Sequence, residues 1–295
     1  MPREHVKLAT DAAFPPGRLY IVGTPIGNLE DITLRAIRVL KEVDVVACED
    51  TRRTRQLLDH YGITTRTVSY HNHNELMRAP ELIVRLEDGE NIALVSDAGM
   101  PLVSDPGHRL VKLAVRHNIP VIPVPGASAL VATLAAAGLP LEECLFVGFL
   151  PSKHLVRQKF LGKLRGARSI LFHEAPQRVV ESLQDILVVL GDRPVVLARE
   201  VTKLHEEFLR GYVSEVLLRM QRRPVRGEIT VLLGPPDENT NQGSPPIPAS
   251  VGEDVERVMA EQGIDERAAL KAVAKARGIS KSDAYRQLQI EKSEK

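Results

Sequence analysis

Short apolar runs that end in loops of small, turn-forming residues are the feature that most constrains the fold of this chain. Three such pairs of run and loop occur: Leu19–Val22 before Gly23–Asn28, Ile92–Val95 before Ser96–Gly99, and Val121–Val124 before Pro125–Ser128. Uncharged runs of this length predict buried strands. Ligands of open α/β sheets bind outside the carboxyl ends of the strands, where backbone groups are accessible. The three loops therefore predict one shared pocket.

Residues 18–124 alternate between strand-like and helical patterns. We expect strands at Leu19–Val22, Val43–Cys48, Thr67–Tyr70, Ile92–Ser96 and Val121–Val124, and helices at Leu34–Lys41, Arg52–Tyr61, Glu75–Glu87 and Gly107–His117. This order is typical of a mainly parallel sheet covered by helices. It predicts an N-terminal α/β domain over residues 18–124.

A second alternation, over residues 125–234, begins with an alanine-rich helix expected at Ala127–Ala137. Five strands are expected after it: Leu145–Phe149, Ser169–Phe172, Pro194–Ala198, Glu207–Tyr212 and Glu228–Leu233. The last two alternate with period two, which favours antiparallel pairing and a mixed sheet. The chain is thus predicted to be an α/β protein with two five-stranded sheets.

The two ends of the chain have a different composition. Residues 1–17 carry scattered charges, which predicts a flexible tail and no secretory signal. Residues 235–250 are rich in proline and predict a linker. Residues 251–295 predict a small helix-turn-helix-like domain with helices at Val251–Gln262, Asp265–Arg277 and Ser280–Gln289, where Asp265 and Ser280 are N-caps and Gly263 and Gly278 are terminators.

Charge is nearly balanced, with 39 Lys and Arg against 38 Asp and Glu, so any surface for nucleic acid must be local. Residues 267–286 contain six Lys or Arg and one acid, which fits either a solvated helix face or a nucleic-acid contact. The two cysteines, Cys48 and Cys144, are too few for a disulfide framework or a metal site, and both are expected to be buried thiols. Ile119–Leu141 is uncharged but contains four prolines, so we expect no membrane span and a cytoplasmic protein.

The first loop, Gly23–Asn28, has two glycines four residues apart and no lysine where a P-loop would hold phosphates. This pattern argues against a nucleotide triphosphatase. Glycine and proline fix a sharp turn and let a ligand approach the backbone closely. The loop therefore suits an adenosine-type cofactor held by main-chain groups, although an ordinary tight turn has the same pattern.

Longer motifs carry a family resemblance. The segments Val22–Ala36, Ser96–Gly99 and Pro125–Ser128 resemble the tetrapyrrole methylase fold of S-adenosylmethionine-dependent (class III) methyltransferases. Four further segments resemble one branch of that fold, the ribosomal RNA small subunit methyltransferase I proteins: Cys48–Arg52, Ser69–Glu75, Phe172–Arg178 and Arg199–Glu206. The resemblance extends from Leu19 to about Leu233, and more loosely into the helical tail.

The resemblance implies a two-domain fold and a homodimer, with S-adenosyl-L-methionine bound in the cleft between the domains. It also implies methyl transfer to the ribose 2′-hydroxyl of a cytidine, at position 1402 in the decoding region of 16S ribosomal RNA. The partner would be 16S rRNA or the small ribosomal subunit. In-line methyl transfer to an oxygen needs positioned reactants and a general base, and no metal.

The matching motifs and the predicted strand ends supply the candidate site residues. For the cofactor they are Thr24, Pro25, Asp97, Gly99, Pro101, Ser128, Ala129, Ala198 and Gly227. For the RNA substrate they are Arg52, Arg53, Asn72, Asn74, Arg178 and Lys203. For the general base they are Glu49, Asp50, His71, His73 and Glu200, with Glu75 nearby.

Several of these residues also have ordinary structural explanations. Glu49 and Asp50 can cap the next helix while the arginines after them hold phosphates, and Ser128 can cap Ala129–Ala137 while it contacts the cofactor. Arg178 and Lys203 can form exposed ion pairs, Lys203 with Glu206 or Glu207.

The polar segment His71–Glu75 offers substrate hydrogen bonds, or a helix start with Asn74 as N-cap and Glu75 in the first turn. The two histidines stand at i and i+2 without a third soft ligand, which argues against a metal site.

Two other functions stay open at this stage. The same fold can serve a tetrapyrrole or other small-molecule methyltransferase, since a fold does not fix the acceptor. A non-enzymatic regulator that senses a ligand and binds nucleic acid through its helical tail is the second alternative. The basic segment Thr51–Arg55 argues for RNA over a small acceptor.

Overall fold

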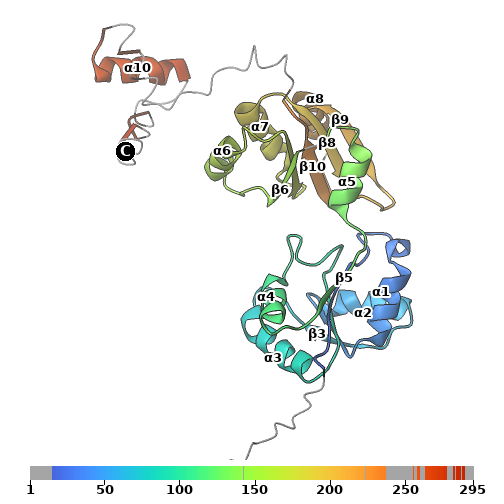
Figure 1. Ribbon diagram of the computed structural model, residues 1–295. Coiled ribbons are helices and arrows are strands. Elements are labelled where there is room, and N and C mark those ends of the chain that lie inside the picture. The colour runs from blue at the N-terminus through green and yellow to red at the C-terminus, as the bar shows by residue number, and fades with distance from the viewer. Residues whose placement is uncertain are drawn as a thin grey trace, which may run out of the picture. The chain divides into compact units, whose positions relative to one another are not determined.

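The computed structural model describes residues 15–141, 143–222 and 224–236, together with 255, 258–259, 263–277, 282, 284–286 and 288–289. The chain divides into two compact units, Met1–Asp237 and Glu238–Lys295. The first unit contains two five-stranded sheets (Figure 1). The predicted tail over residues 1–17 and the linker over residues 235–250 lie largely outside the described residues, and the predicted domain boundaries stay predictions.

The first sheet has the strand order β3-β2-β4-β1-β5, and all its pairings are parallel. Its strands are β1 (Leu19–Val22), β2 (Val45–Cys48), β3 (Arg66–Ser69), β4 (Ile92–Val95) and β5 (Val121–Val124). Strands β2 and β4 are buried at every position, because helices cover both faces of the sheet. The predicted mainly parallel sheet is confirmed, with strand ends that differ by at most two residues.

Four helices connect these strands: α1 (Leu34–Glu42), α2 (Thr51–His60), α3 (Glu75–Glu87) and α4 (His108–Arg116). One core cluster joins the sheet to α1 and α2 through residues such as Val39 and Leu58. The other joins it to α3 and α4 through residues such as Leu82 and Leu110. The two helix pairs therefore lie on opposite faces of the sheet (Figure 1).

The second sheet has the order β6-β7-β10-β8-β9. Its strands are β6 (Cys144–Phe149), β7 (Ser169–Glu174), β8 (Pro194–Arg199), β9 (Glu207–Tyr212) and β10 (Ile229–Leu233). Only β6 and β7 pair in parallel; the other three pairings are antiparallel. The predicted mixed sheet is confirmed.

Helices α6 (His154–Lys163), α7 (Val179–Leu190) and α8 (Val213–Gln221) pack on one face of this sheet. Helix α5 (Ala129–Ala137) packs on the other face against β10. Ser128 begins α5 as its N-cap, since its Oγ accepts a hydrogen bond from the N–H of Val131. The capping predicted for Ser128 is confirmed.

The two cysteines differ in exposure. Cys48 is buried as predicted, whereas Cys144 is only half-buried. Cys144 begins β6, an edge strand of its sheet, so one side of the strand has no neighbour to cover it. The expectation of a buried thiol at Cys144 is therefore wrong. Both cysteines are free.

The second unit contains α10 (Glu266–Arg277), which matches the helix predicted from Asp265. Asp265 acts as the predicted cap, because its Oδ1 accepts a hydrogen bond from the N–H of Ala268 at 2.8 Å. Gly263 has φ +63°, as expected for a helix terminator. The two flanking helices of the predicted bundle fall largely outside the described residues, as do Gly278 and Ser280. No helix in the described part of the chain is long and apolar enough to cross a membrane.

Candidate active site

The carboxyl ends of β1, β4 and β5 are held together by their backbones. Gly23 N–H donates to Val124 O at 3.0 Å, and Thr24 and Gly99 exchange two backbone hydrogen bonds of 2.9 and 3.1 Å. Thr24 Oγ1 also donates to Ser96 O at 3.1 Å. A Cβ placed on Gly23 would lie only 2.8 Å from Gly126 Cα, so the first and third loops touch through glycine. The predicted convergence of the three loops is confirmed.

A cavity of about 330 Å³ opens at these strand ends, and we name it the central cavity. The loops after β1 and β4 of the first sheet contribute Ile26, Ala98–Met100 and Val103–Asp105. The start of α5 contributes Ser128–Leu130. The second sheet and its loops contribute Phe149, His173–Pro176 and Gly227–Thr230. Four predicted cofactor residues line it: Gly99, Ser128, Ala129 and Gly227.

A second cavity of about 340 Å³ shares Ile26, Ala98 and Glu228 with the central cavity. Its lining contains Thr24, Pro25 and Asp97, which were predicted for the cofactor, and Arg53 and Lys203, which were predicted for RNA. These nine predicted residues are thus brought together at one edge of the sheet, divided between two adjoining cavities. Pro101 and Ala198 are buried and line neither hollow; Ala198 packs with Ile26 and Val201.

Asp97 links the loops after β2 and β4. Its Oδ1 accepts a hydrogen bond from the N–H of Asp50 at 3.1 Å, and its Oδ2 pairs with Arg53 at 3.2 Å. Asp50 caps α2, because its Oδ1 accepts from the N–H of Arg52 at 2.9 Å. Hydrogen bonds from Arg52 lower the pKa of Asp50. The capping alternative for Asp50 is therefore observed.

Asp105 is one of three carboxylates that line the central cavity, with Glu174 and Glu228, and none of the three was predicted from the sequence as a site residue. Burial raises the pKa of Asp105 to about 6, and the negative charge of Glu49 adds to the rise, while a hydrogen bond from Ser96 opposes it. Among the residues described, no cation pairs with Asp105. Its position in the loop after β4 was the available signal, because that loop was already predicted to face the ligand.

His173 lies on the opposite wall, on β7. Its Nδ1 is 3.0 Å from Thr230 Oγ1, and its ring lies 5.5 Å from the rings of both Phe146 and Phe149. Burial lowers the pKa of His173, which favours the neutral imidazole. Phe149 lines the cavity with 53% of its surface exposed. This wall offers an aromatic face to a planar ligand.

Lys203 forms a bridge between two carboxylates. Its Nζ lies 3.0 Å from Glu200 Oε1 and 3.1 Å from Glu228 Oε2. The prediction that Lys203 pairs with Glu206 or Glu207 is wrong. Glu206 accepts a hydrogen bond from the N–H of Thr202, and Glu207 forms an ion pair with Arg199. The hydrogen bond that Glu200 accepts from the N–H of Glu228 lowers the pKa of Glu200, and the hydrogen bond and charge of Lys203 lower it further.

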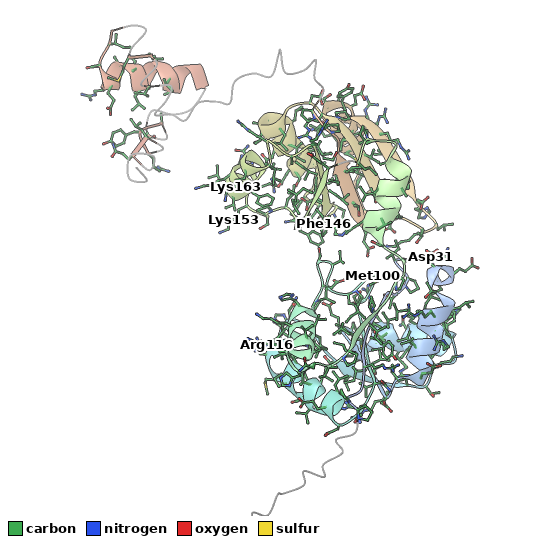
Figure 2. The ribbon with its side chains drawn as sticks, in the orientation of Figure 1. Asp31, Met100, Arg116, Phe146, Lys153 and Lys163 are labelled. Carbon is green, nitrogen blue, oxygen red and sulfur yellow. The ribbon has the colours of Figure 1, made fainter. Side chains whose placement is uncertain are left out.

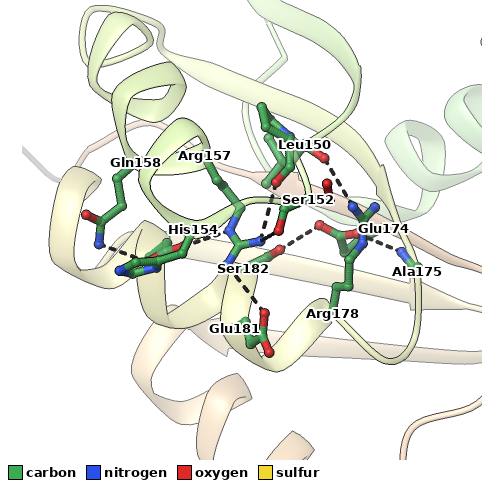
Figure 3. Close-up of polar contacts among 12 residues, drawn as sticks. Leu150, Ser152, His154, Arg157, Gln158, Glu174, Ala175, Arg178, Glu181 and Ser182 are labelled. Carbon is green, nitrogen blue, oxygen red and sulfur yellow. Dashed lines mark hydrogen bonds and ion pairs between the residues drawn. The ribbon is translucent and has the colours of Figure 1, made fainter.

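Arg178 stands immediately before α7 and pairs with the buried carboxylate of Glu174 at 2.6 Å (Figure 3). Glu174 also accepts hydrogen bonds from Ser182 Oγ at 2.6 Å and the N–H of Ala175 at 2.8 Å. This network fixes the loop Glu174–Pro176 that lines the central cavity. An ion pair of Arg178 is thus observed, with a buried partner.

The histidine-rich segment lies at the start of α3 and lines neither cavity. Asn74 occupies the N-cap position, but its Oδ1 accepts from the N–H of His71 at 2.8 Å and does not cap the helix. Glu75 is in the first turn as predicted. The rings of His71 and His73 are 5.9 Å apart. Within the described residues no cluster of His, Cys, Asp and Glu is arranged to hold a metal ion.

Comparisons with known proteins agree with this arrangement. Residues 18–217 match the family model of Tetrapyrrole (Corrin/Porphyrin) Methylases. The chain is 44% identical over 276 residues to the Ribosomal RNA small subunit methyltransferase I of Halalkalibacterium halodurans, which covers 91% of this chain and 93% of that protein. It is 48% identical over 217 residues to the protein of the same name from Thermotoga maritima, covering 74% and 98%.

Solved structures share the fold at lower identity. Uroporphyrin-III C-methyltransferase from Thermus thermophilus, in complex with S-adenosylhomocysteine, aligns with a TM-score of 0.53 at 23% identity, over 74% of this chain and 97% of that one. A diphthine synthase homologue from Entamoeba histolytica aligns with a TM-score of 0.56 at 18% identity, over 75% and 93%. The fold and the convergent strand-end loops define a methylase of the tetrapyrrole methylase class. Within that class, the chain belongs to the ribosomal RNA small subunit methyltransferase I family.

Proposed function

We propose that this chain transfers a methyl group from S-adenosyl-L-methionine to the ribose 2′-hydroxyl of a cytidine in the decoding region of 16S ribosomal RNA. The observation that carries the proposal is the central cavity, where three strand-end loops of one sheet face an aromatic and acidic wall of the other. The relatives' shared name supplies the substrate class, small-subunit ribosomal RNA. A homodimer and a cytoplasmic location are part of the same proposal.

The residues present fit the cofactor. The cavity of about 330 Å³ is within the range of small-molecule sites. Gly99 has φ +82°, and a Cβ there would lie 3.2 Å from the side chain of Ile26, so the floor is bare backbone. Gly99, Ser128, Ala129 and Gly227 would hold the cofactor directly, with Thr24, Pro25 and Asp97 at the adjoining hollow. When bound, S-adenosylmethionine supplies a sulfonium methyl group to an oxygen nucleophile.

The acceptor hydroxyl must lose its proton as the new bond to carbon forms, so a base is required. The lining of the central cavity contains three carboxylates: Asp105, Glu174 and Glu228. Arg178 neutralises Glu174 and Lys203 neutralises Glu228. Asp105 has no such partner among the residues described, and its pKa of about 6 lets it be ionised yet basic at pH 7. We propose that Asp105 is the general base that accepts the proton of the ribose hydroxyl.

The other base candidates stay predictions, and the geometry favours them less. Asp50 caps a helix and Glu200 is paired with Lys203. Neither His71 nor His73 lines the central cavity or the second cavity next to it. Glu49 lies close enough to Asp105 for its charge to raise the pKa of that residue, so Glu49 fits the role of a neighbour that makes Asp105 more basic.

Methyl transfer to purified small subunits tests the proposal. Cofactor labelled on its methyl group is incubated with the protein and unmethylated subunits, and the RNA is then hydrolysed with alkali. A labelled, alkali-resistant dinucleotide that contains cytidine is the expected product, because a 2′-O-methyl group blocks cleavage. Label on a base, or label that enters a tetrapyrrole and never RNA, would contradict it. Tight DNA binding without any transfer would favour the regulator.

A further inference from the structure

Helix α6 and the turn after it carry several cations and no acid. Residues 144–173 contain six Lys or Arg and no Asp or Glu. Five of the six are exposed: Lys153, Lys159, Lys163, Arg165 and Arg168. In the part of the chain that the structure describes, none of these five has an ion pair. We name these five residues the α6 surface; Lys153 and Lys163 mark its two ends on the helix (Figure 2).

The sixth cation is buried and anchors the helix. Arg157 is 1% exposed, and its Nε donates to Asp185 Oδ2 on α7 at 2.6 Å. Figure 3 shows its longer ion pair with Glu181, also on α7, at 3.6 Å. Its Nη1 donates to the backbone oxygens of Pro151 and Ser152 at 3.4 and 3.2 Å. Asp185 and Glu181 therefore compensate the inward-facing charge of α6, whereas no ion pair within the described residues compensates the five outward-facing charges.

Side-chain spacing makes this surface costly in the isolated protein. Lys159 and Lys163 are four residues apart on α6, so both lie on one helix face, and like charges at this spacing destabilise a helix. Leu155 and Val156, on the same helix, are 76% and 51% exposed. A polyanion would neutralise the lysines, and their aliphatic stems together with Leu155 would be covered.

The α6 surface is continuous along the chain with the central cavity. Phe149, which lines the cavity, ends β6, and Lys153 follows it by four residues at the start of α6. Arg157 fixes the connecting loop at Pro151 and Ser152. An RNA strand that runs along α6, about 15 Å from Lys153 to Lys163, would therefore lead into the cavity past the exposed ring of Phe149.

We infer that the α6 surface binds the phosphates of the RNA strand that delivers the acceptor nucleotide, with Phe149 stacking on a base. This inference rests on the proposed function and adds a positioning surface to it. Phosphate contacts of this kind fix register without reading sequence. Stacking on an aromatic side chain is a usual way to hold an unpaired base.

The test compares two triple variants with equal loss of charge. One carries Lys153→Gln, Lys159→Gln and Lys163→Gln. The matched control carries Lys41→Gln, Lys112→Gln and Arg116→Gln, three exposed cations on α1 and α4. A third variant, with Lys→Arg at 153, 159 and 163, retains the charge and checks that the helix tolerates substitution. Each is titrated with a decoding-region RNA fragment at several salt concentrations, and S-adenosylhomocysteine affinity is measured by calorimetry.

The expected result for the α6 variant is at least tenfold weaker RNA binding, with S-adenosylhomocysteine affinity within twofold of wild type. The slope of log affinity against log salt should fall by about 0.7 for each phosphate that the variant no longer neutralises. The control and the Lys→Arg variant should bind like wild type. Wild-type RNA affinity in the α6 variant, equal losses in both triple variants, or equal binding of anionic lipid vesicles and RNA would overturn the inference.

A failure of the proposed function gives a different result. In that case the wild-type protein transfers no methyl group to ribose in the subunit assay, whatever the RNA titrations show. If ribose methylation occurs but the α6 variant binds RNA normally, only the α6 inference is wrong.

Discussion

The N–H of Asp50 donates a hydrogen bond to Oδ1 of Asp97, 3.1 Å away, and this bond joins the loop after β2 to the loop after β4. These strands are neighbours in the sheet, so the two loops leave from the same edge. The other oxygen of Asp97 holds Arg53 at 3.2 Å. One carboxylate thus ties together a helix cap, a cation and the lining of the second cavity.

Replacing Asp97 is expected to weaken cofactor binding. Asp97→Ala leaves the N–H of Asp50 and the guanidinium of Arg53 without their acceptor, and the loop Ser96–Gly99 loses its tie to β2. We expect the Kd for S-adenosylhomocysteine to rise by about tenfold or more, or about 1.4 kcal/mol. Asp59→Ala, at an exposed carboxylate on α2, is the control. Calorimetry that finds unchanged affinity for Asp97→Ala would refute this role.

Asp105 predicts a specific pH profile. A base acts only when ionised, so kcat/KM should rise with pH, reach half its maximum at about 6, the pKa of Asp105, and level off above that. Asp105→Asn should lower kcat by about 10²- to 10⁴-fold and abolish this rise, with S-adenosylhomocysteine affinity unchanged. Glu42→Gln, at a surface ion pair with Arg38, should leave both the rate and the profile unchanged. An unaltered profile in Asp105→Asn would exclude it as the base.

The same carboxylate should cost stability at neutral pH. Its pKa is raised from 3.8 to about 6 on folding, so the folded protein binds the proton more tightly than the unfolded chain does. The resulting stability is present below pH 3.8 and is lost as pH rises through about 6. Asp105→Asn should therefore increase the free energy of unfolding by at most about 3 kcal/mol at pH 7.5 and by almost nothing at pH 3.5, since one pKa unit corresponds to about 1.4 kcal/mol. Urea denaturation at both pH values measures this, and an equal effect at both would contradict it.

The buried pair Arg157–Asp185 should behave differently from a surface pair. Asp185→Ala leaves a guanidinium that is 1% exposed with only the more distant carboxylate of Glu181, 3.6 Å away, and we expect a loss of about 3 kcal/mol. The double variant Arg157→Met and Asp185→Leu removes both charges and should recover most of that loss. Breaking the exposed Arg38–Glu42 pair should cost less than about 1 kcal/mol. A double-mutant cycle in urea tests the pair, and additive losses would show that the two residues are not coupled.

Glycine at position 126 should be irreplaceable. A Cβ there would lie 2.9 Å from the Cα, carbonyl carbon and oxygen of Gly23, all backbone atoms that have no rotamer to move away. Gly126→Ala should lower both stability and S-adenosylhomocysteine affinity. Gly162, inside α6, has open space around it, so Gly162→Ala should instead stabilise the helix by about 0.5–1 kcal/mol. The melting temperatures of the two variants should shift in opposite directions; a shared sign would contradict this packing.

Apolar runs in the sequence predicted both sheets. Strands such as β2 and β4 are buried at every position, so their residues must be uncharged and the run is easy to recognise. Apolar patterns failed to predict α6, where the local pattern is misleading. In α6 the charged Arg157 faces the core while the apolar Leu155 faces solvent. A local pattern does not reveal this inversion, since it depends on Asp185, which lies 28 residues away.

The sequence predicted the location of the site well, but it predicted the interactions of the site residues less well. Strand-end loops must meet where parallel neighbours end, so Gly99 and Ser128 could be placed on the pocket from their sequence positions. Partners could not be predicted in the same way. Lys203 is bridged by Glu200 and Glu228, and Glu228 is distant in sequence. The sequence places Asp105 in the loop after β4, but the residue stands out only once the cavity is known and no cation is found beside it among the described residues.

The position of bound S-adenosylhomocysteine in a crystal of this protein tests the central claim most directly. We predict that it occupies the central cavity, against the backbone of Gly99 and Ser128, with the sulfur facing the wall that carries Asp105. Binding at any other place, or a crystal soaked at saturating concentration in which protein side chains fill that cavity, would contradict the account.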